Sequence, residues 1–270
     1  MADAHLRPGL SEAAGTQNAR LERLLAEAAD RAGHVVFLGD MFHLWLERRG
    51  RLAGDYEGIL RLLARMADGR PRGWMRHVCG NRDFAAGAAL PAEGGSEAPF
   101  AGFFRGKDRR FPSRLAQAGV TPEGAWWDIR HGGRGVRLLH GDRYCLRQPF
   151  FQALRWLLAG PVGRTLAWRL PWPMLRTLAE FLQNRRRRPS TLATPALQER
   201  NQKRIAQKPV ARAVAGGADL VVVGHLHQGF TREVPLPGGR TGRLVSLPAF
   251  CDGWYGVMEN GQVELRRMEK

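Results

Sequence analysis

Four short apolar runs, each ending in a polar loop, form the strongest structural pattern of the chain. They span residues 35–38, 73–79, 135–139 and 219–223. The first run, VVFL, has no alternation of apolar and polar positions, which is typical of a central parallel strand buried on both faces. Because open α/β sheets carry their chemistry at the carboxyl ends of the strands, the polar residues after these runs are candidate site residues.

Helical periodicity flanks the first run. Residues 17–32 predict an amphipathic helix, and residues 56–67 predict a second one. Residues 85–110 are rich in Gly, Ala, Pro and charge, which predicts a long loop or insertion. Near the end of the chain, three segments predict antiparallel strands that close the sheet, with a turn at Asn260-Gly261: residues 243–248, 256–259 and 262–267.

Residues 148–208 differ from the rest because large apolar side chains and arginines are mixed there and prolines interrupt the pattern. Breaks at Gly160-Pro161 and at residues 171–173 predict two or three helices. We therefore divide the chain into a main domain, residues 1–147 and 209–270, and an inserted helical cap, residues 148–208.

Two interpretations of the cap stay open. It packs on the main sheet as an ordinary helical subdomain, as apolar stripes usually do. Alternatively, Trp156, Trp168 and Trp172 beside many arginines form an amphipathic surface for acyl chains at a membrane interface. The arginine run 185–188 is a solvated face in the first case and contacts an anionic membrane or a phosphate in the second.

Composition limits the cellular compartment and the classes of partner that we expect. The three cysteines, Cys79, Cys145 and Cys251, show no CxxC or zinc-ligand spacing, so we expect structural thiols in a reducing cytoplasm. No secretory signal is recognisable, and no apolar run reaches the roughly 18 residues of a spanning helix. A net charge of +17 and a pI near 11.3 favour anionic partners: nucleic acid, an anionic membrane surface or a phosphorylated substrate.

The loops after the apolar runs, together with the first residues of the chain, offer oxygen and nitrogen donors. Asp3 and His5 lie two residues apart, which places both side chains on one face of an extended segment. Two divalent cations about 3.5–4 Å apart need a bridging carboxylate and further carboxylate, amide and imidazole donors, and no thiolate is among these residues. A hydrolytic centre of manganese or a similar ion is favoured, with Asp40 as the bridge. The donors are Asp3, His5, Asp40, Asn81, His140, His225 and His227.

These residues stand in the boxes DxH, GD, GNRD, HGD and GHxH, which in this order resemble the calcineurin-like metallophosphoesterase superfamily. The fold that the resemblance implies is an α/β four-layer α/β/β/α sandwich, here with an inserted helical cap. More narrowly, ADAHL, LGDMFHLW, GNRDF, LHGDRYC and the insertion after HGD resemble the UDP-2,3-diacylglucosamine diphosphatases of the lipid A pathway, over most of the chain outside residues 85–110.

The resemblance implies metal-dependent hydrolysis of the pyrophosphate bond of UDP-2,3-diacylglucosamine to 2,3-diacylglucosamine 1-phosphate and UMP. Two divalent ions, expected to be Mn²⁺, would take part. One ion would be held by Asp3, His5, Asp40 and His227. The other would be held by Asp40, Asn81, His140 and His225. Arg82, the arginine of GNRD, would stabilise charge on the phosphate oxygens.

The same resemblance implies that Asp40, Asn81, Arg82 and His140 form the catalytic set and that Asn81 and Arg82 contact the substrate. It also implies a cytoplasmic enzyme, peripheral on the inner face of the bacterial inner membrane, with a UDP-sugar lipid as substrate and an anionic membrane surface as partner. Nucleic acid is not expected, because the basic residues of the cap stand among Trp, Leu and Phe.

Two other functions stay open on the same scaffold. One is a metallophosphoesterase of other specificity, a phosphodiesterase or nuclease, and the other is a binding module without turnover. The first strand of the family precedes the DxH box, but only Met1 and Ala2 do so here. We therefore expect either a nearly missing first strand or a start that is internal to the natural chain.

The remaining histidines, His34, His43, His77 and His131, are interpreted as ordinary polar residues. Among them His43 could reach a substrate, because it follows Asp40 by three residues. Asp83 is expected to orient Arg82 or to cap its loop, and Asp142 to support a metal ligand.

Overall fold

The structure is a computed structural model, and it describes residues 1–9, 12–48, 50–80, 82–83, 113–124, 126–142, 169–184, 195–235, 239 and 241–268. Several residues of the sequence-based predictions lie outside these ranges: Asn81, the expected loop 85–110, Cys145, Trp156, Gly160, Pro161, Trp168 and the arginine run 185–188.

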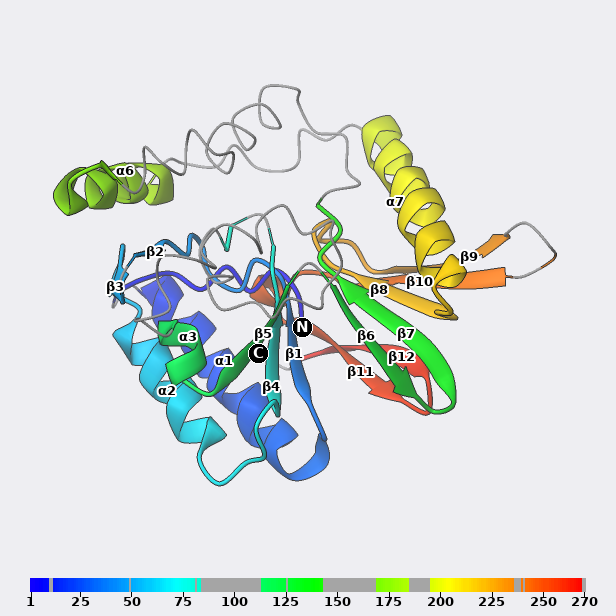
Figure 1. The fold of residues 1–270 in the computed structure, drawn as a ribbon, viewed down its shortest axis with the longest axis horizontal. Helices are drawn as coiled ribbons and strands as arrows, with labels where there is room; N and C mark the ends of the chain where they lie inside the picture. Colours follow the sequence, from blue (N-terminus) through cyan, green and yellow to red (C-terminus); the bar gives the residue numbers. More distant parts are fainter. Residues whose placement is uncertain are drawn as a thin grey trace.

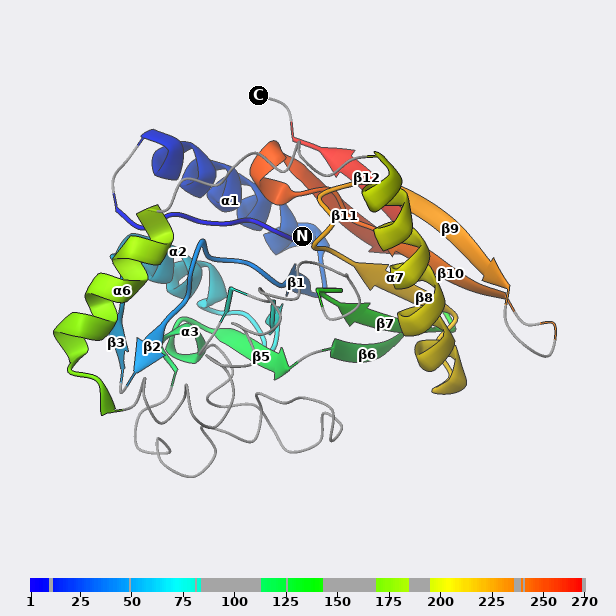
Figure 2. The same cartoon turned by 90° about the horizontal axis from the view of Figure 1, so that it is seen from above.

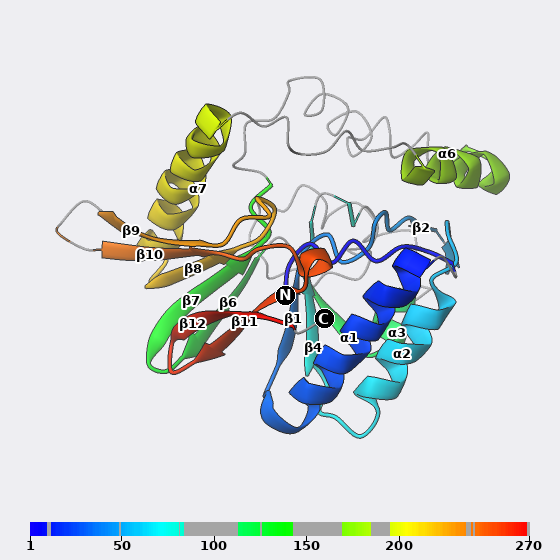
Figure 3. The ribbon, with the colours of Figure 1, turned by 180° about the vertical axis from the view of Figure 1, so that it is seen from behind.

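The first sheet is parallel and carries the predicted strand after which Asp40 stands. Its strands are β1 (Val35–Leu38), β4 (Met75–Val78) and β5 (Val120–Gly124), in the order β1-β4-β5. Helices cover one face of this sheet, and α1 and α2 lie side by side there (Figure 1, Figure 3). These helices are α1 (Glu12–Arg31), α2 (Glu57–Ala67) and the short α3 (Arg114–Gln117).

The first residues of the chain lie alongside β1 in place of a regular strand. The Met1 amino group donates to Val36 O at 2.8 Å, Leu38 N donates to Met1 O at 2.7 Å, and a parallel bridge joins Leu6 to Phe42. On the opposite side, Phe250 N donates to the carbonyl of the second residue at 2.8 Å. The segment that carries the DxH box is therefore hydrogen-bonded into the fold on both sides.

A second, mixed sheet of five strands faces the first, in the order β6-β7-β8-β10-β9. The pairs β7–β8 and β8–β10 are parallel, and the outer pairs β6–β7 and β10–β9 are antiparallel. The long helix α7 (Pro195–Ala215) lies over β8 and β10 (Figure 2). The strands are β6 (Trp126–His131), β7 (Arg134–Leu139), β8 (Leu220–Val223), β9 (Phe230–Pro235) and β10 (Thr241–Ser246).

Three apolar clusters separate four layers. Phe37 and Leu63 belong to the cluster between the first sheet and its helices. Val78 and Val222 belong to the cluster between the two sheets. Ile205 of α7 belongs to the cluster on the outer face of the second sheet. Because each sheet buries both of its faces, the expected α/β/β/α sandwich is confirmed.

The end of the chain partly contradicts the sequence-based prediction. β10 pairs antiparallel with β9, as predicted, but its other neighbour, β8, runs parallel to it. The antiparallel hairpin of β11 (Trp254–Glu259) and β12 (Gln262–Arg267) is present and forms a sheet of its own. Its turn is as predicted, with positive φ at Asn260 and Gly261. A 3₁₀ turn, η3 (Phe250–Asp252), precedes this hairpin.

Two helices of the described residues fall at least partly in the expected cap. α6 (Trp172–Asn184) begins beside the small hairpin of β2 (Glu47–Arg48) and β3 (Arg51–Leu52), where Trp172 packs in a cluster with Leu44 and Ala53. α7 starts inside the expected cap but continues past residue 208 to the second sheet. The division into two domains stays a prediction. Within the described residues, the helices are too short or too polar to span a bilayer.

Candidate metal centre

The loops that follow the strands of the two sheets bring the predicted donors together. Asp40 follows β1, His140 follows β7, and His225 and His227 follow β8. Glycine permits this approach, because a Cβ on Gly39 would lie only 2.3 Å from His140 Nδ1. A Cβ on Gly80, in the loop after β4, would lie 2.4 Å from Asp40 Oδ1. Side chains at either position would push the donors apart.

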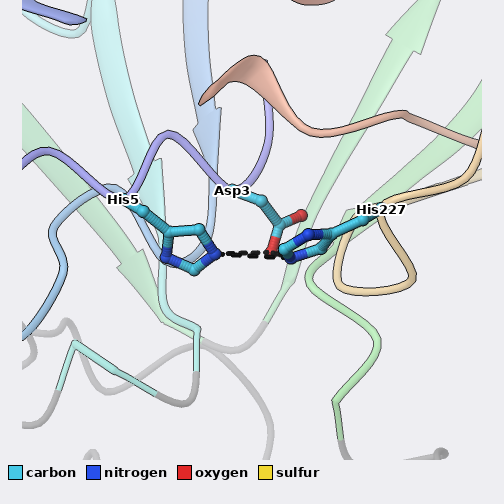
Figure 4. Close-up of side chains that lie close together, drawn as sticks. All are labelled: Asp3, His5 and His227. Carbon is cyan, nitrogen blue, oxygen red and sulfur yellow. Dashed lines mark hydrogen bonds and ion pairs between the residues drawn. The ribbon is translucent and has the colours of Figure 1, made fainter. Parts of the chain in front are cut away.

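One group of donors consists of Asp3, His5 and His227 (Figure 4). His227 Nε2 lies 3.2 Å from Asp3 Oδ1, and His5 Nε2 lies 3.9 Å from the same oxygen. The two imidazole Nε2 atoms are 3.3 Å apart. Asp3 and His5 are buried, and His227 is partly exposed. Three ligand atoms therefore converge on one point that solvent reaches from the His227 side.

A second group consists of Asp3, Asp40 and His140, all buried, with one ligand atom of each within 4.8 Å of the others. His140 Nε2 lies 3.5 Å from Asp40 Oδ1 and 3.3 Å from His225 Nδ1. His225 N donates to Asp3 Oδ2 at 2.7 Å, which ties the loop after β8 to the second group. The second group thus adjoins a fourth donor, the His225 ring.

Burial and neighbouring charges shift the pKa values of these residues. Burial raises the pKa of Asp40 to about 7, against the opposing effect of His140. Burial alone would lower the pKa of His140, but Asp40 and Asp3 raise it to about 9. Burial and the neighbouring His140 lower the pKa of His225 to about 4. Burial would raise the pKa of Asp3, but His140, His227 and His5 hold it well below its usual range.

The donors fit divalent metal ions. His140 Nδ1 lies 3.0 Å from Leu38 O and must donate, because a carbonyl only accepts. In the neutral ring this leaves the lone pair of Nε2 facing Asp40 and His225. Asp3 Oδ1 is buried and faces the imidazole Nε2 atoms of His227 and His5, at 3.2 Å and 3.9 Å. A buried carboxylate oxygen between imidazole nitrogens is expected where a cation completes the site.

The structure brings together the predicted ligands that it describes: Asp3, His5, Asp40, His140, His225 and His227. Asn81, the remaining predicted ligand, lies outside the described residues. Asp3 belongs to both groups, whereas Asp40 belongs to the second. The bridging role assigned to Asp40 stays a prediction, and Asp3 is equally placed to serve two ions.

The backbone at the site is strained in a repeated way. Asp3, His5, Asp40, His225 and His227 all have positive φ, between 47° and 67°. Elsewhere in the described chain the only non-glycine residue with positive φ is Asn260, in a hairpin turn. The left-handed conformation costs a non-glycine residue about 1–2 kcal/mol, and such outliers concentrate at functional sites.

Arg82 lies beside the second group, as the sequence suggested. Its backbone N donates to Asp40 Oδ1 at 2.9 Å, and its Nε lies 3.5 Å from Asp40 Oδ2. Its Nη1 donates to His43 O at 2.9 Å and lies 3.4 Å from the His43 ring Nδ1. His43 is buried and contacts Arg82, so it is a neighbour of the site rather than one of the ordinary polar histidines among which it was placed.

Asp83 caps its loop, which is one of the two roles expected for it; the other was to orient Arg82. Its Oδ2 accepts from Gly80 N at 2.9 Å and from Asp40 N at 2.8 Å. His77 Nε2 lies 3.1 Å from the same oxygen, and both side chains are fully buried. Sequence reasoning missed this role for His77, because its partner becomes visible only when the strand and loop are folded. Asp142 adds to the effect of Asp40 and Asp3 in raising the pKa of His140, and its role in supporting a metal ligand stays a prediction.

A search of protein-family models gave no match, and neither did a search of curated proteins. Among solved structures, the chain is similar to a protein from Streptococcus pneumoniae TIGR4 described as a conserved predicted phosphoesterase. The identity is 12%, the TM-score is 0.34, and the match covers 99% of this chain and 95% of that one.

The chain is also similar to a 5′-nucleotidase precursor from Thermus thermophilus, with 16% identity and a TM-score of 0.34. This match covers 99% of the chain but only 53% of the nucleotidase, so the chain spans about half the length of that protein. The fold rests on the four layers, and the site rests on the side chains described above.

Proposed function

We propose that the chain is a metal-dependent hydrolase of phosphate esters or anhydrides. The observation that carries the proposal is the pair of adjoining donor groups that share the buried Asp3. Oxygen and nitrogen donors without cysteine suit Mn²⁺ or a similar ion in a hydrolytic centre. When bound, such ions supply Lewis acidity and lower the pKa of water to near neutrality.

Besides holding the metal ions, the protein would contribute to catalysis by placing the positive charge of Arg82 beside the reacting phosphate. Arg82 is fixed by Asp40 on one side and by the His43 carbonyl on the other, so its guanidinium is oriented before a substrate arrives. A phosphate oxygen beside Asp40 would meet this positive charge. Because arginine stays protonated at all working pH values, Arg82 stabilises charge and does not act as a proton donor.

We further propose UDP-2,3-diacylglucosamine as the substrate, hydrolysed at its pyrophosphate bond to UMP and the acylated sugar 1-phosphate. The sequence motifs ADAHL, LGDMFHLW and GNRDF support this choice. The presence of Arg82 also supports this substrate. An arginine does not protonate a leaving group, and UMP is a good leaving group that requires no dedicated acid beside the metals. The net charge of +17 favours an anionic lipid surface, so we propose a peripheral protein of the cytoplasmic membrane face.

The experiment is an assay of UMP release from UDP-2,3-diacylglucosamine by the full chain with added MnCl₂. We expect release that EDTA abolishes, and loss of at least about 10²-fold in Asp40→Ala, because that change removes a ligand and the partner of Arg82. Asp30→Ala is the matched control, since Asp30 is an exposed carboxylate on α1. Its activity should equal that of the unaltered chain.

The outcomes separate the two levels of the proposal. If the sugar nucleotide is untouched while DNA or a cyclic nucleotide is cleaved with Mn²⁺, the lipid substrate is wrong and the phosphohydrolase stands. If no phosphate ester or anhydride is cleaved with any divalent ion, the phosphohydrolase proposal fails as well.

A further inference from the structure

A buried ion pair lies next to Asp40 of the candidate metal centre, and neither of its residues is a predicted metal ligand. His77 is on β4 and Asp83 is in the loop that follows it, and both side chains are fully enclosed. His77 Nε2 lies 3.1 Å from Asp83 Oδ2 and is the donor, because a carboxylate only accepts. Because the pair is removed from water, its burial costs free energy unless hydrogen bonds and the partner charge compensate both side chains.

The oxygen that His77 contacts also holds the backbone of the site. Asp83 Oδ2 accepts from Asp40 N at 2.8 Å and from Gly80 N at 2.9 Å. It therefore joins the loop after β1 to the loop after β4. These two loops leave neighbouring parallel strands, so one carboxylate oxygen spans both.

A second hydrogen bond runs in the opposite direction between the same loops. Arg82 N donates to Asp40 Oδ1 at 2.9 Å, while Asp40 N donates to Asp83 Oδ2. The carboxylate of Asp40 and its backbone are thus both fixed by adjacent residues of one loop. With Asp40 held in a left-handed conformation, φ 48°, its orientation depends on these bonds.

We propose that His77 is a positioning residue of the metal centre, which orients Asp83 so that Asp83 fixes the backbone of Asp40 and of Gly80. Without the His77 donor, Asp83 would keep two backbone donors but lose its ionic partner in a dry site. The carboxylate would then rotate or draw in water, and Asp40 would lose its fixed position. This inference deepens the proposed function and rests on it for its catalytic consequence.

The test measures Mn²⁺ binding by isothermal titration calorimetry on the purified full chain, which requires no substrate. We expect His77→Leu to weaken Mn²⁺ binding by about 10- to 100-fold, the usual loss when a residue that orients a metal ligand is removed. His77→Gln keeps an N–H donor near Asp83, so it should recover part of the affinity. This partial rescue separates positioning from a general packing defect.

Leu63→Ala is the matched control for lost stability. Leu63 is fully buried in α2, in the same apolar cluster as β1 and β4, and it belongs to neither donor group. This variant should melt at a lower temperature, yet bind Mn²⁺ as the unaltered chain does. If Leu63→Ala loses as much Mn²⁺ affinity as His77→Leu, the effect is a stability effect and the inference is wrong.

Activity provides the second readout. At saturating Mn²⁺, His77→Leu should lower kcat for UDP-2,3-diacylglucosamine more than it changes KM, because the groups that lose their position, Asp40 and the Arg82 that it holds, act on the reacting phosphate. Unchanged Mn²⁺ affinity and unchanged kcat in folded His77→Leu would overturn the inference and leave the proposed function standing. An unaltered chain that takes up no Mn²⁺ would overturn the proposed function, and the inference with it.

Discussion

At the scale of single residues, the site depends on backbone conformations that its side chains disfavour. Asp3, His5, Asp40, His225 and His227 all have positive φ, although glycine alone adopts this region at no cost. Asp40, His225 and His227 could be predicted from the sequence because they follow apolar strand-like runs, and polar residues after parallel strands meet at one edge. Asp3 and His5 could be predicted from their spacing of two in an extended segment. Their left-handed backbones could not, since local sequence favours ordinary φ for Asp and His.

The strained backbone predicts that glycine at position 227 is more stabilising than alanine, the reverse of the usual order. In metal-free protein, His227→Gly should be more stable than His227→Ala by about 1 kcal/mol, because glycine removes the cost of positive φ. Urea unfolding in EDTA measures the difference. At Leu226, whose φ is not positive, glycine should be the less stable of the two. Equal or reversed stabilities at His227 would show that the backbone there is not strained.

The His77–Asp83 pair predicts how stability depends on pH. Burial alone would lower the pKa of His77, but Asp83 raises it to about 10, against about 6.5 in the unfolded chain. A raised folded-state pKa means that the stabilisation is complete below about pH 6.5 and is lost as pH rises through about 10.

The check is urea unfolding of metal-free protein and of His77→Gln at about pH 6 and about pH 10. We expect a difference in free energy of unfolding of about 3 kcal/mol at the lower pH, shrinking at the higher pH. Titrating groups distant from the pair are common to both proteins and cancel in the difference, so the difference reports on His77 together with Asp83. A difference that is constant or grows with pH would contradict a charged His77.

At the scale of elements, an aromatic cluster fixes the loop after β1. Phe42, Trp45 and Tyr56 pack with ring centroids 4.3 to 5.8 Å apart. Tyr56 Oη donates to Leu44 O at 3.0 Å, within the loop that also carries the His43 carbonyl. Arg82 is therefore placed from both sides by loops with buried anchors.

Removing the Tyr56 hydroxyl tests this anchoring. Tyr56→Phe keeps the ring but leaves the buried Leu44 carbonyl without this donor, so the protein should lose about 1–3 kcal/mol of stability. Urea unfolding gives the loss. Tyr255→Phe, at a partly exposed position of β11, is the control and should cost much less. If the two variants lose the same stability, the hydroxyl does not anchor the loop.

The elements that could be predicted are those with an unbroken apolar run or a clear helical period, such as β1, β8 and α2. β5 and β9 could not be predicted in this way. β5 contains Pro122, which usually argues against a strand, but it lies at the edge of its sheet, where proline is tolerated. β9 is also an edge strand and carries charged side chains among its apolar ones, so it resembles a loop in sequence.

At the scale of the whole molecule, the four layers explain why donors distant in sequence meet. The two sheets pack face to face through Leu38, Val78 and Val222, so the loops after β1, β4, β7 and β8 open at one end. The order of layers was expected from the family resemblance that the sequence motifs carry. The pairing of β10 with β8 did not, because strand direction in a mixed sheet depends on connections that periodicity does not encode.

The central claim is that these loops hold divalent ions. Elemental analysis of the full chain after incubation with Mn²⁺ and removal of unbound metal tests it most directly, and we expect about two ions per chain. Because Asp3 belongs to both donor groups and His5 to one, Asp3→Asn should lose more metal than His5→Ala. A chain that is folded and retains no Mn²⁺ or other divalent ion would contradict the account.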